Sequence, residues 1–103
     1  MPDLLSGTVT FLFTDIEGGT ALWERDRTAM RAAVERHLTL LRTAVGQHQG
    51  AVFKVVGDAV QAAFAGAPAA VSAGLDAQRA LQAEPWPAEI GPLRVRMAFH
   101  TGA

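Results

Sequence analysis

Cysteine is absent from this chain of 103 residues, and so is any excess of basic charge. Without cysteine, neither a disulfide nor a thiolate metal site can form, which fits a reducing cytoplasm. Nine Lys and Arg residues face ten Asp and Glu residues, whereas nucleic-acid-binding proteins normally carry a basic surface. The composition therefore argues against a disulfide-stabilised protein and against a nucleic-acid partner.

Long apolar runs are missing as well. No stretch reaches the roughly 18 consecutive apolar residues that a membrane span needs, because Lys54 and Asp58 interrupt the most apolar third of the chain. The stretch from Met1 to Leu5 lacks the basic region and the apolar run of a signal peptide. We therefore expect a cytoplasmic domain with no membrane contact from this segment.

What the chain does have is apolar content, at 50% of its residues. A chain of this length is long enough to bury about two-thirds of its unfolded surface without disulfides or metals. Length and composition together predict a single domain over residues 1–103.

The first half reads as a strand followed by one long helix. Residues 8–14 are rich in β-branched and aromatic types, as strands are. From about residue 21 to residue 47, apolar positions recur at steps of three and four, which predicts one helix. Thr20 is the expected N-cap, and Gly46 or Gly50 the expected left-handed C-cap. The apolar stripe of this helix consists of Met30, Val34, Leu38, Leu41 and Val45.

The second half begins with a hairpin. Two apolar runs, residues 51–56 and 59–64, are separated by Gly57 and Asp58, a two-residue turn signal. If Phe53 and Val55 point into the core, then Lys54 lies on the opposite sheet face.

A second helix and a last strand follow. Pro68 suits the first turn of a helix, and Val71 and Leu75 are expected to face the core. Pro85 ends the helix. Alternation of apolar and polar types over residues 93–100 then predicts a half-buried strand.

The predicted order is βαββαβ, which is the ferredoxin-like unit of the α+β class. Its helices cover one face of an antiparallel sheet and leave the other face open. Val52 and Val56 flank Lys54 on that open face, which makes the face too apolar to be merely hydrated. We therefore expect the open face to meet a partner subunit.

Two acidic residues stand at turns of this arrangement. Asp15 follows the first strand, and Asp58 lies between the second and third. If the first and second strands are neighbours, both carboxylates lie at one sheet edge, where like charges about 4 Å apart repel by roughly 4 kcal/mol. Mg²⁺ reverses this repulsion and is usually bound by one or two carboxylates plus substrate phosphates. Either acid alone is also explained as a turn or capping residue, but the pair with Lys54 favours a metal site.

Three stretches carry the most informative motifs. They are GTVTFLFTDIEGGT at residues 7–20, GAVFKVVGDA at residues 50–59 and VRMAFHTG at residues 95–102. In this order and with these separations, they resemble the class III nucleotide cyclase domains, the adenylate and guanylate cyclase family. The likeness runs over almost the full length of the chain, and the fold of that family agrees with the βαββαβ reading.

The resemblance implies a metal site. Asp15 and Asp58 look like the two metal-binding aspartates of the family, with the backbone carbonyl of Ile16 as a further ligand. Two Mg²⁺ or Mn²⁺ ions per site would bridge the triphosphate and activate the ribose 3′-hydroxyl for attack on the α-phosphate. That role matches two-metal catalysis, in which the ions stabilise the attacking and leaving oxygens.

The resemblance also implies a substrate. Gly18, Gly19 and Thr20 would approach phosphate oxygens through their amides, although many relatives have serine where this chain has Gly19. Lys54 looks like the base-selecting lysine that donates to adenine, so ATP is the expected nucleotide and cyclic AMP and pyrophosphate are the expected products. The site would lie between the subunits of a homodimer joined through the open sheet face, in a protein of signal transduction.

The family pattern continues beyond residue 102. There it places a partner aspartate for base selection, together with an asparagine and an arginine that stabilise the transition state. We therefore expect an incomplete domain with no catalytic residue before Ala103. It would have a metal and nucleotide half-site and little or no turnover by itself.

Two alternatives stay open. A catalytically inactive cyclase-like domain could serve regulation or dimerisation. An RNA-recognition module of the same topology could stack a base on Phe11 or Phe13, although the matching strand offers only Phe64 and the basic charge is missing. Arg94 and Arg96 are expected to form a solvated or subunit-facing row.

Overall fold

The structure is a computed structural model that describes residues 8–102. Its elements follow the order β1 (Val9–Ile16), α1 (Gly19–Arg25), α2 (Arg27–Gln47), β2 (Ala51–Val56), β3 (Ala59–Phe64), α3 (Ala67–Ala83) and β4 (Val95–Gly102). Residues 1–7, which include the stretch from Met1 to Leu5 discussed above, and Ala103 lie outside the described residues. Within residues 8–102, no helix combines the length and the apolarity that crossing a membrane requires.

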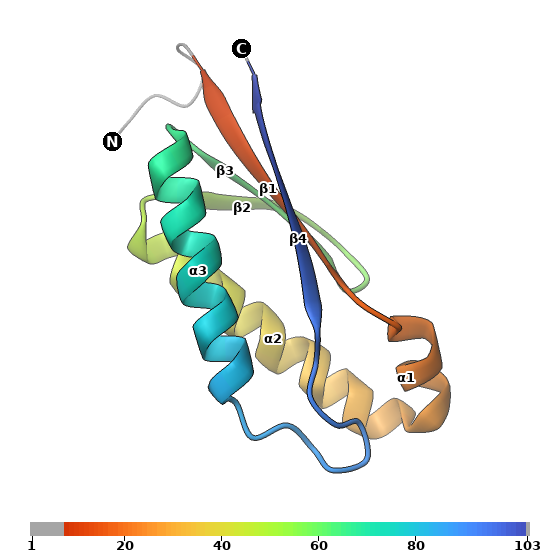
Figure 1. The fold of residues 1–103 in the computed structure, drawn as a ribbon. Helices are drawn as coiled ribbons and strands as arrows, with labels where there is room; N and C mark the ends of the chain where they lie inside the picture. Colours follow the sequence, from red (N-terminus) through yellow and green to blue (C-terminus); the bar gives the residue numbers. More distant parts are fainter. Residues whose placement is uncertain (1–7, 103) are drawn as a thin grey trace.

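The four strands form one antiparallel sheet in the order β2-β3-β1-β4. Helices α2 and α3 pack on the same side of this sheet (Figure 1). The predicted ferredoxin-like α+β fold is therefore confirmed. The assumption that the first and second strands are neighbours is wrong, because β3 pairs with both β1 and β2 and lies between them.

Strand β1 separates the two faces of the sheet by strict alternation. Thr10, Leu12, Thr14 and Ile16 are buried on the side of the helices. Phe11, Phe13 and Asp15 alternate with them and lie on the open face. Asp15 is thus the last side chain that β1 presents to the open face.

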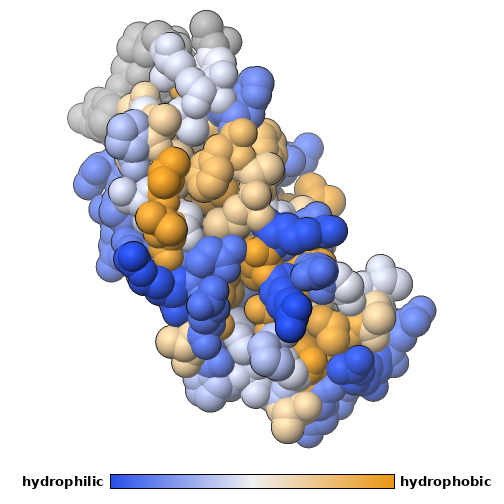
Figure 2. Space-filling model, in the orientation of Figure 1, coloured by the Kyte–Doolittle hydropathy of each residue, from blue (hydrophilic) through white to orange (hydrophobic). Residues whose placement is uncertain are grey.

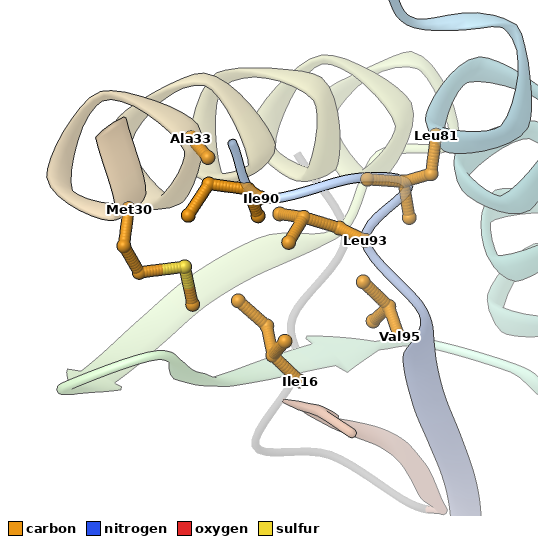
Figure 3. Close-up of a cluster of buried hydrophobic side chains, with 7 residues drawn as sticks. All are labelled: Ile16, Met30, Ala33, Leu81, Ile90, Leu93 and Val95. Atoms are coloured by element: carbon orange, nitrogen blue, oxygen red, sulfur yellow. The ribbon is translucent and has the colours of Figure 1, made fainter. Parts of the chain in front are cut away.

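The core lies between the sheet and the two long helices. One of its clusters joins β1, α2, α3 and the segment before β4, and its side chains point toward one another in Figure 3. It consists of Ile16, Met30, Ala33, Leu81, Ile90, Leu93 and Val95. Because Ile16 belongs to it, the end of β1 is anchored directly beside the candidate site.

Helix α3 packs through small residues. Its buried positions are Ala70, Ala73, Gly74, Ala77 and Leu81. The prediction that Val71 and Leu75 face the core is wrong, since they are 46% and 53% exposed. The ring of Phe99 explains the glycine among them, because a Cβ on Gly74 would lie 2.8 Å from its Cζ. Apolar surface along α3 and the adjoining sheet is visible in Figure 2.

The predicted long helix is divided in two at Asp26. This residue is extended, at φ −158° and ψ 98°, and its carboxylate accepts a hydrogen bond from the Ala29 amide at 3.0 Å. Asp26 therefore ends α1 and caps α2. Thr20, the predicted N-cap, lies inside α1, whose N-cap is Gly18 in a left-handed conformation at φ 67°.

The C-terminal end of α2 also differs from the prediction. The left-handed residue is Gln49 at φ 57°, and neither Gly46 nor Gly50 takes that role. Gly50 has a different function, because a Cβ there would overlap the ring of the fully buried Phe64.

Strand β2 contains an irregularity that the alternation did not reveal. Its register against β3 shifts between Val52 and Lys54, so one residue is added and the facing pattern slips. The prediction that Phe53 and Val55 are core is wrong, since they are 52% and 40% exposed. Lys54 pairs with Gln61 and still lies on the open face.

The last strand was predicted over residues 93–100, but it starts two residues later, at Val95. Leu93 is nevertheless buried just before the strand, at 5% exposure. The alternation along β4 is the predicted one, but Phe99 at its outer end is 44% exposed.

Candidate metal and nucleotide site

Asp15 and Asp58 are brought together by β3. Thr14 pairs with Val60 in the antiparallel ladder of β1 and β3, so continuing the register places Asp58 across from Ile16. The turn before β3 contains Gly57 at φ 59°, a conformation that glycine adopts at no steric cost. The two acids therefore lie at the same end of the β1–β3 pair, whereas the sequence analysis had assumed that the second strand lies beside the first.

Gly19 fixes how closely the first helix approaches this turn. The residue is buried, and a Cβ on it would lie 2.5 Å from Oδ2 of Asp58. A side chain at this position would push the carboxylate away, since real Cβ atoms essentially never come so near. The start of α1 and the Asp58 carboxylate are therefore in direct contact.

A cavity of about 570 Å³ lies between these elements. Six of the seven predicted site residues line it: Asp15, Ile16, Gly18, Gly19, Thr20 and Asp58. The side chain of Ile16 is buried in the core, which leaves the backbone as its polar contribution. Ala21, Glu24 and Arg96 complete the lining.

Lys54 is the predicted site residue that does not line this cavity. It lies on the open face of β2, at the edge of the sheet, and is exposed. Its ammonium is therefore available to a molecule that covers the open face.

Arg96 also lines the cavity, and the sequence analysis did not place it there. It lies opposite Asp15 in the β1–β4 ladder, and its Nε and Nη2 donate to Oδ1 and Oδ2 of that carboxylate at 2.7 and 2.9 Å. This hydrogen bonding and the charge of Asp15, with smaller contributions from Glu17 and Asp58, raise the pKa of Arg96 above its usual value. Alternation alone placed Arg96 on the open face, but the partner strand and register that aim it at Asp15 are not readable from spacing.

The donor set fits a hard divalent cation. Carboxylate and backbone oxygens are the ligands that Mg²⁺ prefers, and it usually takes only one or two carboxylates plus substrate phosphates. Across residues 8–102, no group of three or more His, Cys, Asp or Glu side chains is placed to hold a metal. A site here would accordingly rely on two carboxylates and on oxygens from a bound phosphate.

The open face next to the cavity is aromatic. The ring of Phe11 lies 5.9 Å from that of Phe53 and 6.1 Å from that of Phe13. A second cavity of about 300 Å³ lies on this face, and Phe13, Asp15 and Arg96 are among its lining residues. The ion pair of Asp15 and Arg96 thus stands between the two cavities.

A family model described as the adenylate and guanylate cyclase catalytic domain matches residues 4–102. The chain belongs to this family. A comparison with curated proteins gives no match.

Solved cyclase structures share the fold of this cyclase chain. Adenylate cyclases from Trypanosoma brucei, solved in their monomeric state, superpose with a TM-score of 0.88 at 27% identity, over 98% of this chain and 59% of theirs. A bacterial light-regulated adenylyl cyclase gives 0.82 at 23% identity, over 92% and 53%. The guanylate cyclase domain of RhGC from Catenaria anguillulae, in complex with GTP, gives 0.81 at 18% identity, over 92% and 56%. The chain thus spans less than two-thirds of the length of these structures.

Proposed function

We propose that this cyclase-family chain provides the metal- and triphosphate-binding half of a site that converts ATP to cyclic AMP and pyrophosphate. One observation carries the proposal: Asp15 and Asp58, far apart in sequence, line the same cavity as residues 18–20. Because the chain spans 59% of the length of the trypanosome structure, turnover is proposed for a longer protein. Residues 1–103 are taken as one portion of its catalytic domain.

Each residue has a defined part in this proposal. Asp15, Asp58 and the backbone of Ile16 would hold two Mg²⁺ or Mn²⁺ ions. Such ions, when bound, supply charge that stabilises the attacking and leaving oxygens. The amides of residues 18–20 would face phosphate oxygens. Helix α1 is only seven residues long, so these amides matter more than its dipole.

Base selection is assigned to Lys54. An ammonium group donates three hydrogen bonds and accepts none, so it suits a ring acceptor of adenine. Lys54 lies on the open face outside the cavity, which supports a site shared between two subunits that meet through this face. ATP preference and homodimerisation are therefore linked, because both depend on contacts that the open face makes with a second subunit.

Metal-dependent nucleotide binding tests this function. We expect the 103-residue chain to bind a non-cyclisable ATP analogue more tightly with Mn²⁺ than without it, as measured by calorimetry. Asp15→Asn and Asp58→Asn should each weaken Mn²⁺ binding about tenfold or more, which is about 1.4 kcal/mol, because each removes one of two anionic ligands. Lys54→Glu should reduce the preference for the ATP analogue over the GTP analogue.

The matched control is Glu89→Gln, which removes an exposed carboxylate from the segment between α3 and β4. It should leave Mn²⁺ affinity unchanged. Equal metal binding by wild type, Asp15→Asn and Asp58→Asn would overturn the metal site. Metal binding without any nucleotide binding would favour the regulatory cyclase-like domain instead.

A further inference from the structure

Both oxygens of the Asp15 carboxylate are held by one guanidinium. They accept hydrogen bonds from Arg96, at 2.7 and 2.9 Å. The two side chains are 46% and 64% exposed, so the pair lies at the surface, within reach of ions in solution. Parallel bonds of this kind orient both partners as well as attract them.

A cation that binds Asp15 must compete with this pair. Coordination uses the same oxygens that the guanidinium occupies, and a dication beside Arg96 adds repulsion between like charges. Asp58 also acts on Arg96, since its charge contributes to the raised pKa of the guanidinium. A cation placed between the two acids would therefore weaken both attractions that hold Arg96 in position.

Open space surrounds the side chain of Arg96 on two sides. Arg96 lines the cavity that contains Asp58 and also the second cavity of about 300 Å³ on the open face. That second cavity is lined by Phe13, whose ring can attract a guanidinium through a cation–π contact. The side chain thus has open space beside Phe13 when it leaves Asp15.

We propose that Arg96 is a latch, which pairs with Asp15 in the metal-free chain and turns away from Asp15 toward Phe13 when a divalent cation binds. The proposal rests on the proposed function, in which Asp15 is a metal ligand. Arg96 is here a positioning residue that acts through Asp15. Its effect is to make metal binding weaker than two free carboxylates would allow.

The size of the effect follows from the exposure of the pair. Exposed ion pairs are weak, so a competing ligand is weakened by only about two- to fivefold. The Mn²⁺ affinity of the 103-residue chain can be measured from the electron paramagnetic resonance signal of free Mn²⁺. We expect Arg96→Met to bind Mn²⁺ at least fivefold more tightly, because both the pair and a repulsive charge are lost. Arg96→Lys should bind about twofold more tightly, because it keeps the charge but cannot form two parallel bonds.

Arg94 supplies the matched control. It carries the same charge two residues earlier, it is exposed, and its side chain makes no ion pair with any of residues 8–102. Arg94→Met should change Mn²⁺ affinity less than twofold. If Arg96→Met and Arg94→Met have the same effect, general charge explains the result and the latch is wrong.

The movement itself is visible by NMR. In the metal-free chain, the Nε–H of Arg96 should exchange slowly with water, and Asp15→Asn should abolish this protection. Saturation with Mg²⁺ should give the same loss in the wild-type chain. An Nε–H signal that stays protected at saturating Mg²⁺ would overturn the latch.

The Asp15→Asn chain separates the two proposals. If it loses Mn²⁺ affinity while the Arg96 variants bind like wild type, the metal site stands and the latch alone fails. If it binds Mn²⁺ as well as wild type, Asp15 is not a ligand and both proposals fail.

Discussion

Several glycines of this cyclase chain stand where a neighbouring side chain fills the space that their own would take. Gly19 lies against the Asp58 carboxylate, Gly50 against the ring of Phe64 and Gly74 against Phe99. These neighbours differ in how easily they move. The carboxylate can rotate into the cavity, whereas the ring of Phe64 is fully buried and close-packed interiors resist added volume.

The position of Gly50 yields a prediction on stability. Gly50→Ala should lower the free energy of unfolding by about 1–3 kcal/mol, because the new methyl group overpacks the ring of Phe64. Gly46→Ala is the control, since Gly46 lies in α2 with nothing within 4 Å of its would-be Cβ. That change should raise stability by about 0.5 kcal/mol through helix propensity. Urea denaturation measures both, and equal effects would show that the contact with Phe64 is not tight.

At the scale of elements, Asp26 determines where two helices meet. It closes α1, since its amide donates to the Leu22 carbonyl, and it opens α2 through its carboxylate. The spacing of apolar residues did not reveal this break, because apolar residues occur on both sides of Asp26 and were interpreted as one helix. The break sets the direction of α1, which carries Gly19 and Thr20 at the edge of the cavity.

Removing this cap should be measurable. Asp26→Ala should lower the free energy of unfolding by about 1 kcal/mol, because the Ala29 amide loses its acceptor. Asp26→Asn keeps an acceptor at the same position and should cost only a few tenths of a kcal/mol. Urea denaturation of the two variants distinguishes the hydrogen bond from the charge; equal losses would assign the effect to the charge.

The elements that alternation could predict are those with a regular period. The strands and their order around the helices follow from local pattern, and the structure has them, although Asp15 lies inside β1 rather than after it and the first helical region is divided at Asp26. The irregular features do not follow from pattern: the shift in β2 reverses the facing of Phe53, and small residues replace Val71 and Leu75 in the core. The contact of Asp15 with Arg96 spans 81 positions, so it depends on strand pairing rather than on spacing.

At the scale of the whole molecule, one broad face of the sheet has no helix over it. The described part measures 44 × 22 × 18 Å, with helices on one side of the sheet (Figure 1). The open side carries the rings of Phe11, Phe13 and Phe53 beside Lys54. Apolar rings with a charged neighbour suit the proposed contact with a second subunit.

This contact predicts a change in association. Phe53→Asp should weaken dimerisation about tenfold or more, because burying a phenylalanine side chain contributes about 1.5–3 kcal/mol. Sedimentation velocity measures the effect. Leu75→Asp is the control, because Leu75 is equally exposed, at 53%, but lies on α3. Dissociation by Leu75→Asp alone would place the interface on the helical side.

The pairing of β1 has one more consequence, for synthesis on the ribosome. Strand β1 pairs with two strands that are translated after it, β3 from Ala59 onward and β4 from Val95 onward. Until β4 has left the ribosome, one edge of β1 is unpaired and Asp15 has no guanidinium beside it. The ion pair of Asp15 with Arg96 therefore forms only after β4 has been translated, whereas Asp15 and Asp58 can come together as soon as β3 pairs with β1.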